Sequence, residues 1–254
     1  MTTLLVDAGN SRLKWARWAH GQRSAQSILP YVAESAVQGA LQQLEYLLTT
    51  QQDAERVVLV HVLGQMFAEQ AQSLCTVHQR KLILVRSVNA YGIQLAYPTP
   101  AHFGADRFIG LLAGRKLAAK QAVIVIDAGT AVTIDGLEAS GLHRGGVILP
   151  GLKVMVDSLV QRTQAKHMSS AILEDATVFA NNTLQAMGSG CLLGLVGALE
   201  GICQRMQQQF SSPAQIILCG GDAQRLSESF RLPHQLVPDA LMDGLQFMAE
   251  QEST

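Results

Sequence analysis

Four polar residues near the start of the chain have the types and spacing of a phosphate-binding turn: Asp7, Asn10, Ser11 and Lys14. They follow an apolar run, and Gly9 stands among them. Glycine lets a backbone approach a ligand, and the N–H groups and small hydroxyls of such a turn can hold phosphate oxygens. The carboxylate can hold a hard cation, directly or through water, while the lysine offsets phosphate charge. The same residue types also build ordinary turns, so one copy alone decides little.

The pattern occurs a second time in the middle of the chain. Residues 127–131 (DAGTA) align with residues 7–11 (DAGNS), and each stretch follows one apolar run and precedes another. A strand–turn–strand unit repeated at the head of each half is a fold-level signal. Two such turns facing each other would grip a polyphosphate from both sides, so the repeat favours ligand binding over a simple turn.

The surrounding sequence predicts strands and helices that would position these turns. Apolar runs typical of strands occur at 3–7, 12–18, 56–62, 81–85, 122–128, 131–137, 143–149 and 214–221. Patterns typical of helices occur at 35–48, 65–79, 107–120, 152–160, 184–206 and 239–251, with Ser35 and Asp239 as N-caps. Mixed elements in both halves predict an α/β protein. We expect two domains, at residues 1–115 and 116–254.

Composition narrows the classes of function. Of 254 residues, 48% are hydrophobic and 15% charged, and the net charge is −1, which argues against disorder and against nucleic-acid or membrane-surface binding. The four scattered cysteines are typical of reduced core residues. No signal peptide is evident, and the apolar stretch at 191–202 is too short to span a bilayer and contains Glu200. We therefore expect a cytoplasmic protein.

Further motifs separate the two turns or follow them. They are GADR at 104–107, GG at 145–146, PG at 150–151, NT at 182–183, GSG at 188–190 and IILCGGDA at 216–223. The last has a strand–Gly–Gly–acid form, although alone it is better explained as a strand-to-helix turn with Asp222 as N-cap. From Asp7 to about Ala223, the ordered set resembles the type III pantothenate kinase family of the actin-like ATPase superfamily. Ser11 stands where many relatives carry threonine, and it keeps the hydroxyl.

This resemblance implies a fold and an activity. The fold would be two related actin-like (ribonuclease H-like) domains with a nucleotide cleft between them. The activity would be ATP-dependent phosphorylation of the primary hydroxyl of pantothenate, the first step of coenzyme A biosynthesis. It implies Mg²⁺ and a monovalent cation, K⁺ or NH₄⁺, as cofactors. It also implies a homodimer, for which the apolar stretch at 188–206 is one candidate surface, although that stretch can equally be core.

The resemblance also assigns roles to residues. Asp106 would be the general base that takes the hydroxyl proton. Pantothenate would contact Tyr97, Gly104, Ala105, Asp106, Arg107 and Thr183, with the arginine fork suited to its carboxylate. ATP would contact Asp7, Ala8, Gly9, Asn10, Ser11, Arg12, Leu13, Lys14 and Thr130. Asp127 would bind the monovalent cation.

Structural alternatives stay open for several of these residues. Asp106 and Thr183 can be helix N-caps or first-turn residues, and Tyr97 can be a half-buried tyrosine with its hydroxyl in water. Asp127 can be a second, water-mediated Mg²⁺ contact. The seven histidines show no metal-binding spacing, and His102 lies near the proposed substrate loop without being the expected base.

Two other functions compete with the kinase. One is another kinase or phosphohydrolase of the same superfamily, because the phosphate turns alone do not exclude it. The other is a nucleotide-binding accessory or regulatory factor without catalysis. The GADR segment at 104–107 argues against both, since a pure binder has no need of a base. Fold similarity by itself does not decide among them.

Overall fold

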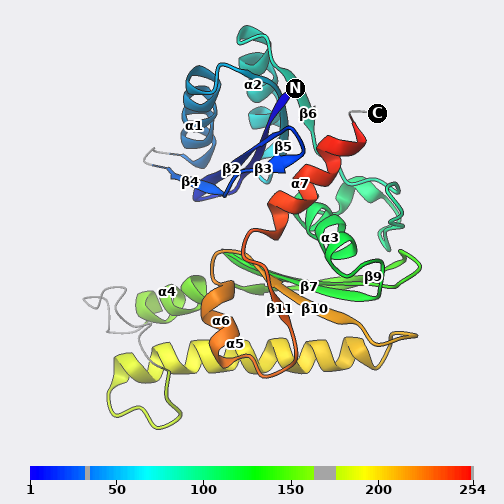
Figure 1. Cartoon of the computed structure of the whole chain (residues 1–254). Coiled ribbons are helices and arrows are strands. Elements are labelled where there is room, and N and C mark those ends of the chain that lie inside the picture. The colour runs from blue at the N-terminus through cyan, green and yellow to red at the C-terminus, as the bar shows by residue number, and fades with distance from the viewer. Residues whose placement is uncertain (32–34, 163–175, 253–254) are drawn as a thin grey trace. The chain divides into compact units, whose positions relative to one another are not determined.

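The computed structural model of the chain describes residues 1–31, 35–162 and 176–252 (Figure 1). The chain divides into two units, one of residues 1–117 and 239–254 and the other of residues 118–238. The break after residue 117 lies close to the predicted break after residue 115. The predicted second domain, however, included the C-terminal segment, which belongs to the first unit.

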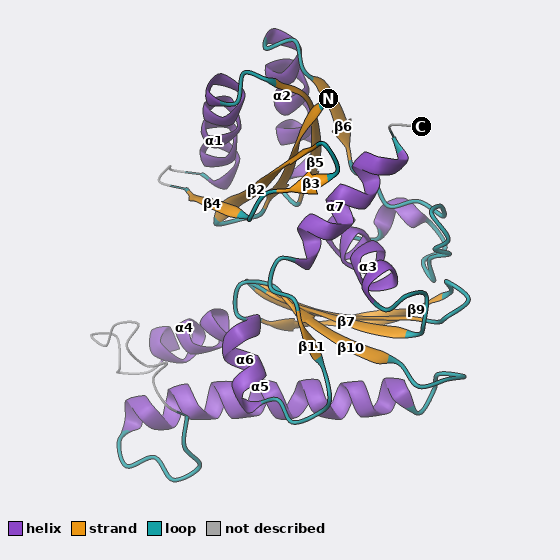
Figure 2. Cartoon of the chain, viewed as in Figure 1, coloured by secondary structure: helices purple, strands orange, loops and turns teal. Residues whose placement is uncertain are grey.

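The first unit contains one sheet, the helices of the N-terminal half of the chain and the C-terminal helix (Figure 2). Its strands are β1 (Thr2–Ala8), β2 (Arg12–Ala19), β3 (Gln22–Arg23), β4 (Ser27–Pro30), β5 (Ala54–His61) and β6 (Lys81–Leu84). Its helices are α1 (Ala36–Thr50), α2 (Gly64–Val77), the 3₁₀ turn η1 (Pro100–His102), α3 (Ala105–Leu117) and α7 (Ala240–Gln251).

The second unit contains the other sheet. Its strands are β7 (Val123–Ala128), β8 (Ala131–Leu137), β9 (His143–Pro150), β10 (Gln215–Cys219) and β11 (Gln235–Leu236). Its helices are α4 (Leu152–Arg162), α5 (Thr183–Gln207) and α6 (Ala223–Ser229).

The two sheets repeat one topology. The first has the order β3-β2-β1-β5-β6, with β4 also paired to β2, and the second has the order β9-β8-β7-β10-β11. In each, the central strand pairs antiparallel with the strand after it and parallel with a later one. The predicted internal repeat is therefore a repeat of structure, and the two phosphate-type turns occupy equivalent places, at the first hairpin of each sheet.

Helix α7 is tied to the first unit at both of its ends. Near its C-terminus, the buried Arg56 of β5 donates from Nη2 to the carbonyl oxygen of Ala249 at 2.9 Å. At its N-terminus, Arg23 forms ion pairs with Asp239 at 2.8 Å and Asp243 at 3.0 Å. Asp239 occupies the N-cap position as predicted, but its side chain makes no capping hydrogen bond. These contacts explain why the C-terminal segment belongs to the first unit and not, as predicted, to the second.

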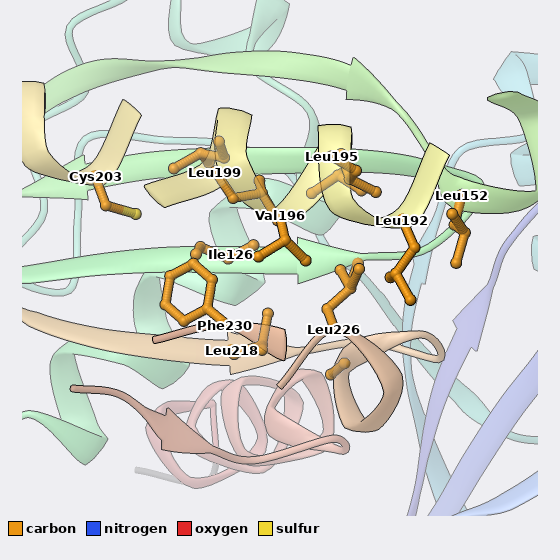
Figure 3. Close-up of a cluster of buried hydrophobic side chains, with 14 of the residues drawn as sticks. Ile126, Leu152, Leu192, Leu195, Val196, Leu199, Cys203, Leu218, Leu226 and Phe230 are labelled. Atoms are coloured by element: carbon orange, nitrogen blue, oxygen red, sulfur yellow. The ribbon is translucent and has the colours of Figure 1, made fainter. Parts of the chain in front are cut away.

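The core of the second unit lies between its sheet and the long helix α5 (Figure 3). One face of α5, including Leu195 and Leu199, packs against Ile126 of β7 and Leu218 of β10. By length and composition α5 could cross a membrane, but 44% of its most apolar window is buried inside the structure. The expectation that the apolar stretch at 191–202 is too short to span a bilayer therefore does not hold for the whole of α5, which has 25 residues and packs one face against the sheet.

Every strand and helix predicted above is present, with small shifts at the ends. The Ser35 side chain caps α1 by accepting a hydrogen bond from the N–H of Gln38 at 3.2 Å. All four cysteines are free and buried, as expected. Helix α6 begins directly after Asp222, its N-cap, as the strand-to-helix alternative had it, although the Asp222 side chain makes no capping hydrogen bond. The elements that the patterns did not predict are short: β3, β4, η1 and β11.

Candidate functional site

The first hairpin connects β1 and β2. Asp7 and Lys14 face each other in the register of these strands, and the N–H of Gly9 donates to the carbonyl oxygen of Arg12 at 3.2 Å. Asn10, Ser11 and Arg12 are exposed at the tip. The turn thus presents small polar groups to solvent, whereas an acid and a base occupy the strands just behind it.

Asp7 is almost fully buried, with 8% of its surface exposed. Burial raises the pKa of its carboxyl group above the ordinary value. The charge of Lys14, whose Nζ is 3.7 Å from Oδ2, opposes this shift, while the negative charge of Asp106 adds to it. A buried acid with a perturbed pKa beside a charged partner is typical of functional sites. Asp7, Lys14 and Asp106 therefore belong to one electrostatic cluster.

Two predicted ATP contacts have buried side chains. Ala8 and Leu13 are fully buried and belong to the core beneath α1 and α2. The carbonyl oxygen of Ala8 also accepts a hydrogen bond from the N–H of Val62 at 3.3 Å. These residues can therefore face a ligand only through their remaining backbone groups.

Asp106 lies in the first turn of α3, where its Oδ1 accepts a hydrogen bond from the N–H of Arg107 at 2.8 Å. This contact matches the helix-terminus role that the sequence left open. Gly104 precedes it, and Ala105 is the first residue of the helix. Both are only partly exposed. An acid at a helix N-terminus is also stabilised by the helix dipole.

Tyr97 and Arg107, predicted to bind the same substrate, are in contact. Nη1 of Arg107 donates to the hydroxyl of Tyr97 at 3.3 Å. The guanidinium also lies 4.5 Å from the ring centre of Phe103, which packs edge-on against Tyr97. Sequence reasoning missed Phe103, although its position four residues before Arg107 was a usable signal. The guanidinium of the buried Arg107 is thus contacted by the hydroxyl of one aromatic residue and the ring of another.

The second hairpin connects β7 and β8. Asp127 pairs with Thr133 across the hairpin, where the first hairpin pairs Asp7 with Lys14. Thr130 is exposed at the tip. Its carbonyl oxygen accepts a hydrogen bond from the N–H of Gly151 at 2.9 Å. The two turns therefore share their form, but the second has no lysine opposite its acid.

The Gly–Gly–Asp motif after β10 lies against this second hairpin. The N–H of Asp222 donates to the carbonyl oxygen of Ala128 at 3.0 Å. A Cβ on Gly220 would lie 2.4 Å from both that oxygen and Oδ1 of Asp127. Gly220 has a φ of +97°, a conformation that favours glycine. Glycine at this position thus lets the carboxylate oxygen of Asp127 and the carbonyl oxygen of Ala128 approach the backbone of the motif closely.

Thr183 is the first residue of α5 and is exposed. The N-cap itself is Asn182, whose side chain accepts a hydrogen bond from the N–H of Gln185 at 3.0 Å. The hydroxyl of Thr183 is therefore not needed for that cap. Within the described ranges, no group of three or more metal-ligating side chains gathers in one place.

The family model and the curated relatives that match this chain carry the same description. A family model described as type III pantothenate kinase matches residues 3–205. A relative from Nitrosococcus oceani, named type III pantothenate kinase, is 32% identical over 257 residues. That match covers 98% of this chain and 94% of the relative.

Solved structures share the fold at lower identity. A Campylobacter jejuni protein described as a conserved Baf family transcriptional activator has a TM-score of 0.64 and 19% identity, with 98% of each chain covered. MreB5 of Spiroplasma citri bound to ADP has a TM-score of 0.57 and 10% identity, covering 99% of this chain and 96% of its own. At these identities the likeness concerns the fold alone, which is the predicted actin-like one.

Proposed function

The chain belongs to the type III pantothenate kinase family, and on that basis we propose how its residues transfer the γ-phosphoryl group of ATP to the primary hydroxyl of pantothenate. The reaction serves coenzyme A biosynthesis. Phosphoryl transfer depends mainly on positioning and charge neutralisation. The observation that carries the proposal is that Asp7, behind the first hairpin, interacts with both Lys14 and Asp106.

Asp106 is the general base. Its Oδ1 is held by the N–H of Arg107, and the carboxylate accepts the proton that leaves the pantothenate hydroxyl as that oxygen bonds to phosphorus. The bond from phosphorus to the β,γ-bridging oxygen breaks, and ADP leaves. Lys14 and the tips of the two hairpins, Asn10, Ser11 and Thr130, neutralise and orient the phosphates.

Arg107 binds the carboxylate of pantothenate. The guanidinium is oriented by Tyr97 and Phe103, and a planar fork of donors suits a carboxylate bidentately. Thr183 and the backbone of Gly104 and Ala105 complete the proposed substrate contacts. This arrangement accounts for an arginine directly after the base, because the first turn of α3 then carries both the general base and the group that binds the substrate carboxylate.

Two cations fit the chemistry of the residues present. Mg²⁺ prefers phosphate, water and few carboxylates, so Asp7 is its proposed protein partner and would help neutralise the phosphates. The oxygens of Asp127 and Ala128 that converge beside Gly220 are hard ligands suited to a monovalent cation. Bound there, K⁺ or NH₄⁺ would add positive charge at the second hairpin.

We also propose a cytoplasmic homodimer. The face of α5 away from the core carries Gly190, Gly194, Gly197 and Gly201, at helical spacing. The first three are exposed, and a Cβ on them would meet nothing within 4 Å. Such a surface lets a second helix approach closely, which supports the turns of α5 from Gly190 to Gly197, within the predicted stretch at 188–206, as the dimer contact.

The test is ATP turnover dependent on pantothenate, with and without K⁺, for the wild type and Asp106→Asn. We expect cation-dependent turnover in the wild type and a loss of about 10²–10⁴-fold in kcat for the variant. ATP binding, measured separately by calorimetry, should persist in the variant. Asp53→Asn, an exposed substitution, is the control. Wild-type ATP binding without turnover on pantothenate would overturn the proposal.

A further inference from the structure

We propose that the second unit binds a small amphipathic carboxylate, with one carboxylate group and an apolar body, in a cavity formed by the β8–β9 hairpin and the C-terminal end of α5. The cavity has a volume of about 300 Å³. That is the lower end of the range for small-molecule sites. None of the residues proposed for ATP, pantothenate or cation binding lines it, so it is a separate site.

Glycines create the space. Gly136 and Gly145 are partners across β8 and β9, and they line the cavity together with Gly146. The sequence singled out the pair at 145–146, and the kinase reaction gives it no role. A Cβ on Gly136 would lie 2.8 Å from the tip of the Phe210 ring. A side chain there would therefore push Phe210 out of its place in the cavity wall.

The hairpin that carries these glycines is firmly held. Nε2 of His143 lies 2.9 Å from Oδ1 of Asp135, and both side chains are buried. The register of β8 and β9 shifts between Gly136 and Leu137, as in a β-bulge. Bulges re-aim a strand, and buried polar pairs specify one arrangement of a core. The cavity wall is thus fixed by the fold without a ligand.

The lining combines an apolar wall with positive charge. Its larger apolar side chains are Val147, Ile202, Met206 and Phe210, and its larger polar ones are Arg144, Arg205 and Gln209. An apolar wall buries an apolar body. Guanidinium groups bind carboxylates through paired hydrogen bonds. A ligand of this shape uses both features.

The two arginines of the cavity provide positive charge that nearby acids do not fully neutralise. Nη1 of Arg205 donates to the carbonyl oxygen of Gly201 at 2.9 Å, and no ion pair within the described residues joins Arg205 to an acid. Nη1 of Arg144 is 4.0 Å from Glu138, which also accepts a hydrogen bond from Ser211. The glutamate therefore offsets at most one of the two arginine charges. Arg205 is the expected partner of the ligand's carboxylate.

The test uses 4-phenylbutyrate as the probe and 4-phenylbutan-1-ol as its uncharged counterpart. Both are titrated calorimetrically into the full chain with saturating pantothenate, so that a carboxylate bound at the kinase site is excluded. We expect the carboxylate to bind at least about tenfold more tightly than the alcohol, about 1.4 kcal/mol. Equal affinities, or no binding of the carboxylate, would overturn the proposal.

Variants locate the site. Arg205→Gln should weaken 4-phenylbutyrate binding about tenfold and leave the alcohol unchanged, because Arg205 is exposed and its loss should not disturb the core. Arg231→Gln, an exposed arginine of the same unit outside the cavity, should bind like the wild type. Equal weakening in both variants would mean general charge attraction and would reject the cavity. Pantothenate-dependent turnover should stay at the wild-type rate in both, so this result is independent of the proposed kinase mechanism.

Discussion

Asp106 occupies the space that a side chain on Gly104 would need. A Cβ built on Gly104 would lie 2.6 Å from Oδ1 of Asp106, and the same oxygen accepts a hydrogen bond from the N–H of Arg107. The backbone of Gly104 is not in the left-handed region. Glycine is therefore required here for the position of the neighbouring carboxylate and not for the path of the chain.

Gly104→Ala should disable the base without removing it. The added methyl group forces the carboxylate of Asp106 off the N–H of Arg107, and we expect kcat to fall about tenfold or more because geometry limits proton transfer. Steady-state kinetics with pantothenate provide the measurement. Ala101→Ser, on the exposed turn before the helix, is the control. A wild-type kcat in Gly104→Ala would show that this carboxylate position does not matter.

Arg107→Lys should damage pantothenate binding although the charge is kept. Lysine offers no planar fork, and it loses the stacking over Phe103 and the oriented donor to Tyr97. Hydrogen bonds to charged groups contribute about 1.5–3 kcal/mol, so we expect KM for pantothenate to rise roughly 10–100-fold.

Tyr97→Phe separates orientation from binding in the same assay. It removes only the hydroxyl that accepts from Arg107, and its effect on KM should be several times smaller. A large fall in kcat with unchanged KM in Arg107→Lys would contradict the assignment of Arg107 to substrate binding.

Local patterns were sufficient to predict the two hairpins and the main helices. The run before Asp7 is apolar, the turn residues follow at once, and Ser35 stands three residues before the N–H that it caps. These signals lie within a few residues of one another. Short elements such as β4, with mostly exposed residues, carry no comparable pattern, because their pairing partner defines them.

Contacts distant in sequence were not predictable. The placement of α7 in the first unit depends on Arg56 and on Gly244, whose Cβ would lie 2.4 Å from the carbonyl oxygen of Ile109. The contact of Gly220 with Asp127 likewise joins residues almost a hundred positions apart. No pattern of apolar residues along the sequence indicates such contacts. Whether residues with related proposed roles lie close together could therefore be seen only in the folded chain.

Gly220→Ala should reduce activation by potassium. The new Cβ would collide with Oδ1 of Asp127 and the carbonyl oxygen of Ala128, the proposed cation ligands. We expect the K⁺ concentration for half-maximal rate to rise about tenfold, measured by turnover against KCl. Gly21→Ala is a matched control, because Gly21 also has a positive φ but a Cβ there meets nothing within 4 Å. Equal effects would indicate backbone strain alone.

Gly197→Glu should separate the proposed homodimer into monomers. A charged side chain on the glycine face of α5 prevents close approach of a second helix, while glutamate favours a helix over glycine by several tenths of a kcal/mol. Sedimentation velocity gives the oligomeric state, and thermal melting checks the fold. Gln42→Glu, exposed on α1, should stay dimeric. A dimer in both variants would exclude this face as the contact.

Asp7→Asn should abolish turnover and yet stabilise the fold at neutral pH. Burial raises the pKa of Asp7, with Lys14 opposing and Asp106 adding to the shift. The folded state therefore favours the protonated acid. Its contribution to stability is full below the unfolded pKa of 3.8 and is lost as pH rises through the folded pKa. Asparagine cannot ionise, so the variant avoids that loss.

The decisive result is how the difference in stability between Asp7→Asn and the wild type depends on pH. In urea unfolding, the free energy of unfolding of Asp7→Asn should exceed that of the wild type at about pH 8. The difference between the two should vanish as pH falls toward about 4. A difference of 1 kcal/mol in the free energy of unfolding corresponds to roughly 2–4 °C in Tm for a chain of this size. Asp53→Asn should behave oppositely, because its hydrogen bond from Arg17 lowers the pKa of Asp53. Lower stability of Asp7→Asn at about pH 8 would mean that the Lys14 contact outweighs burial.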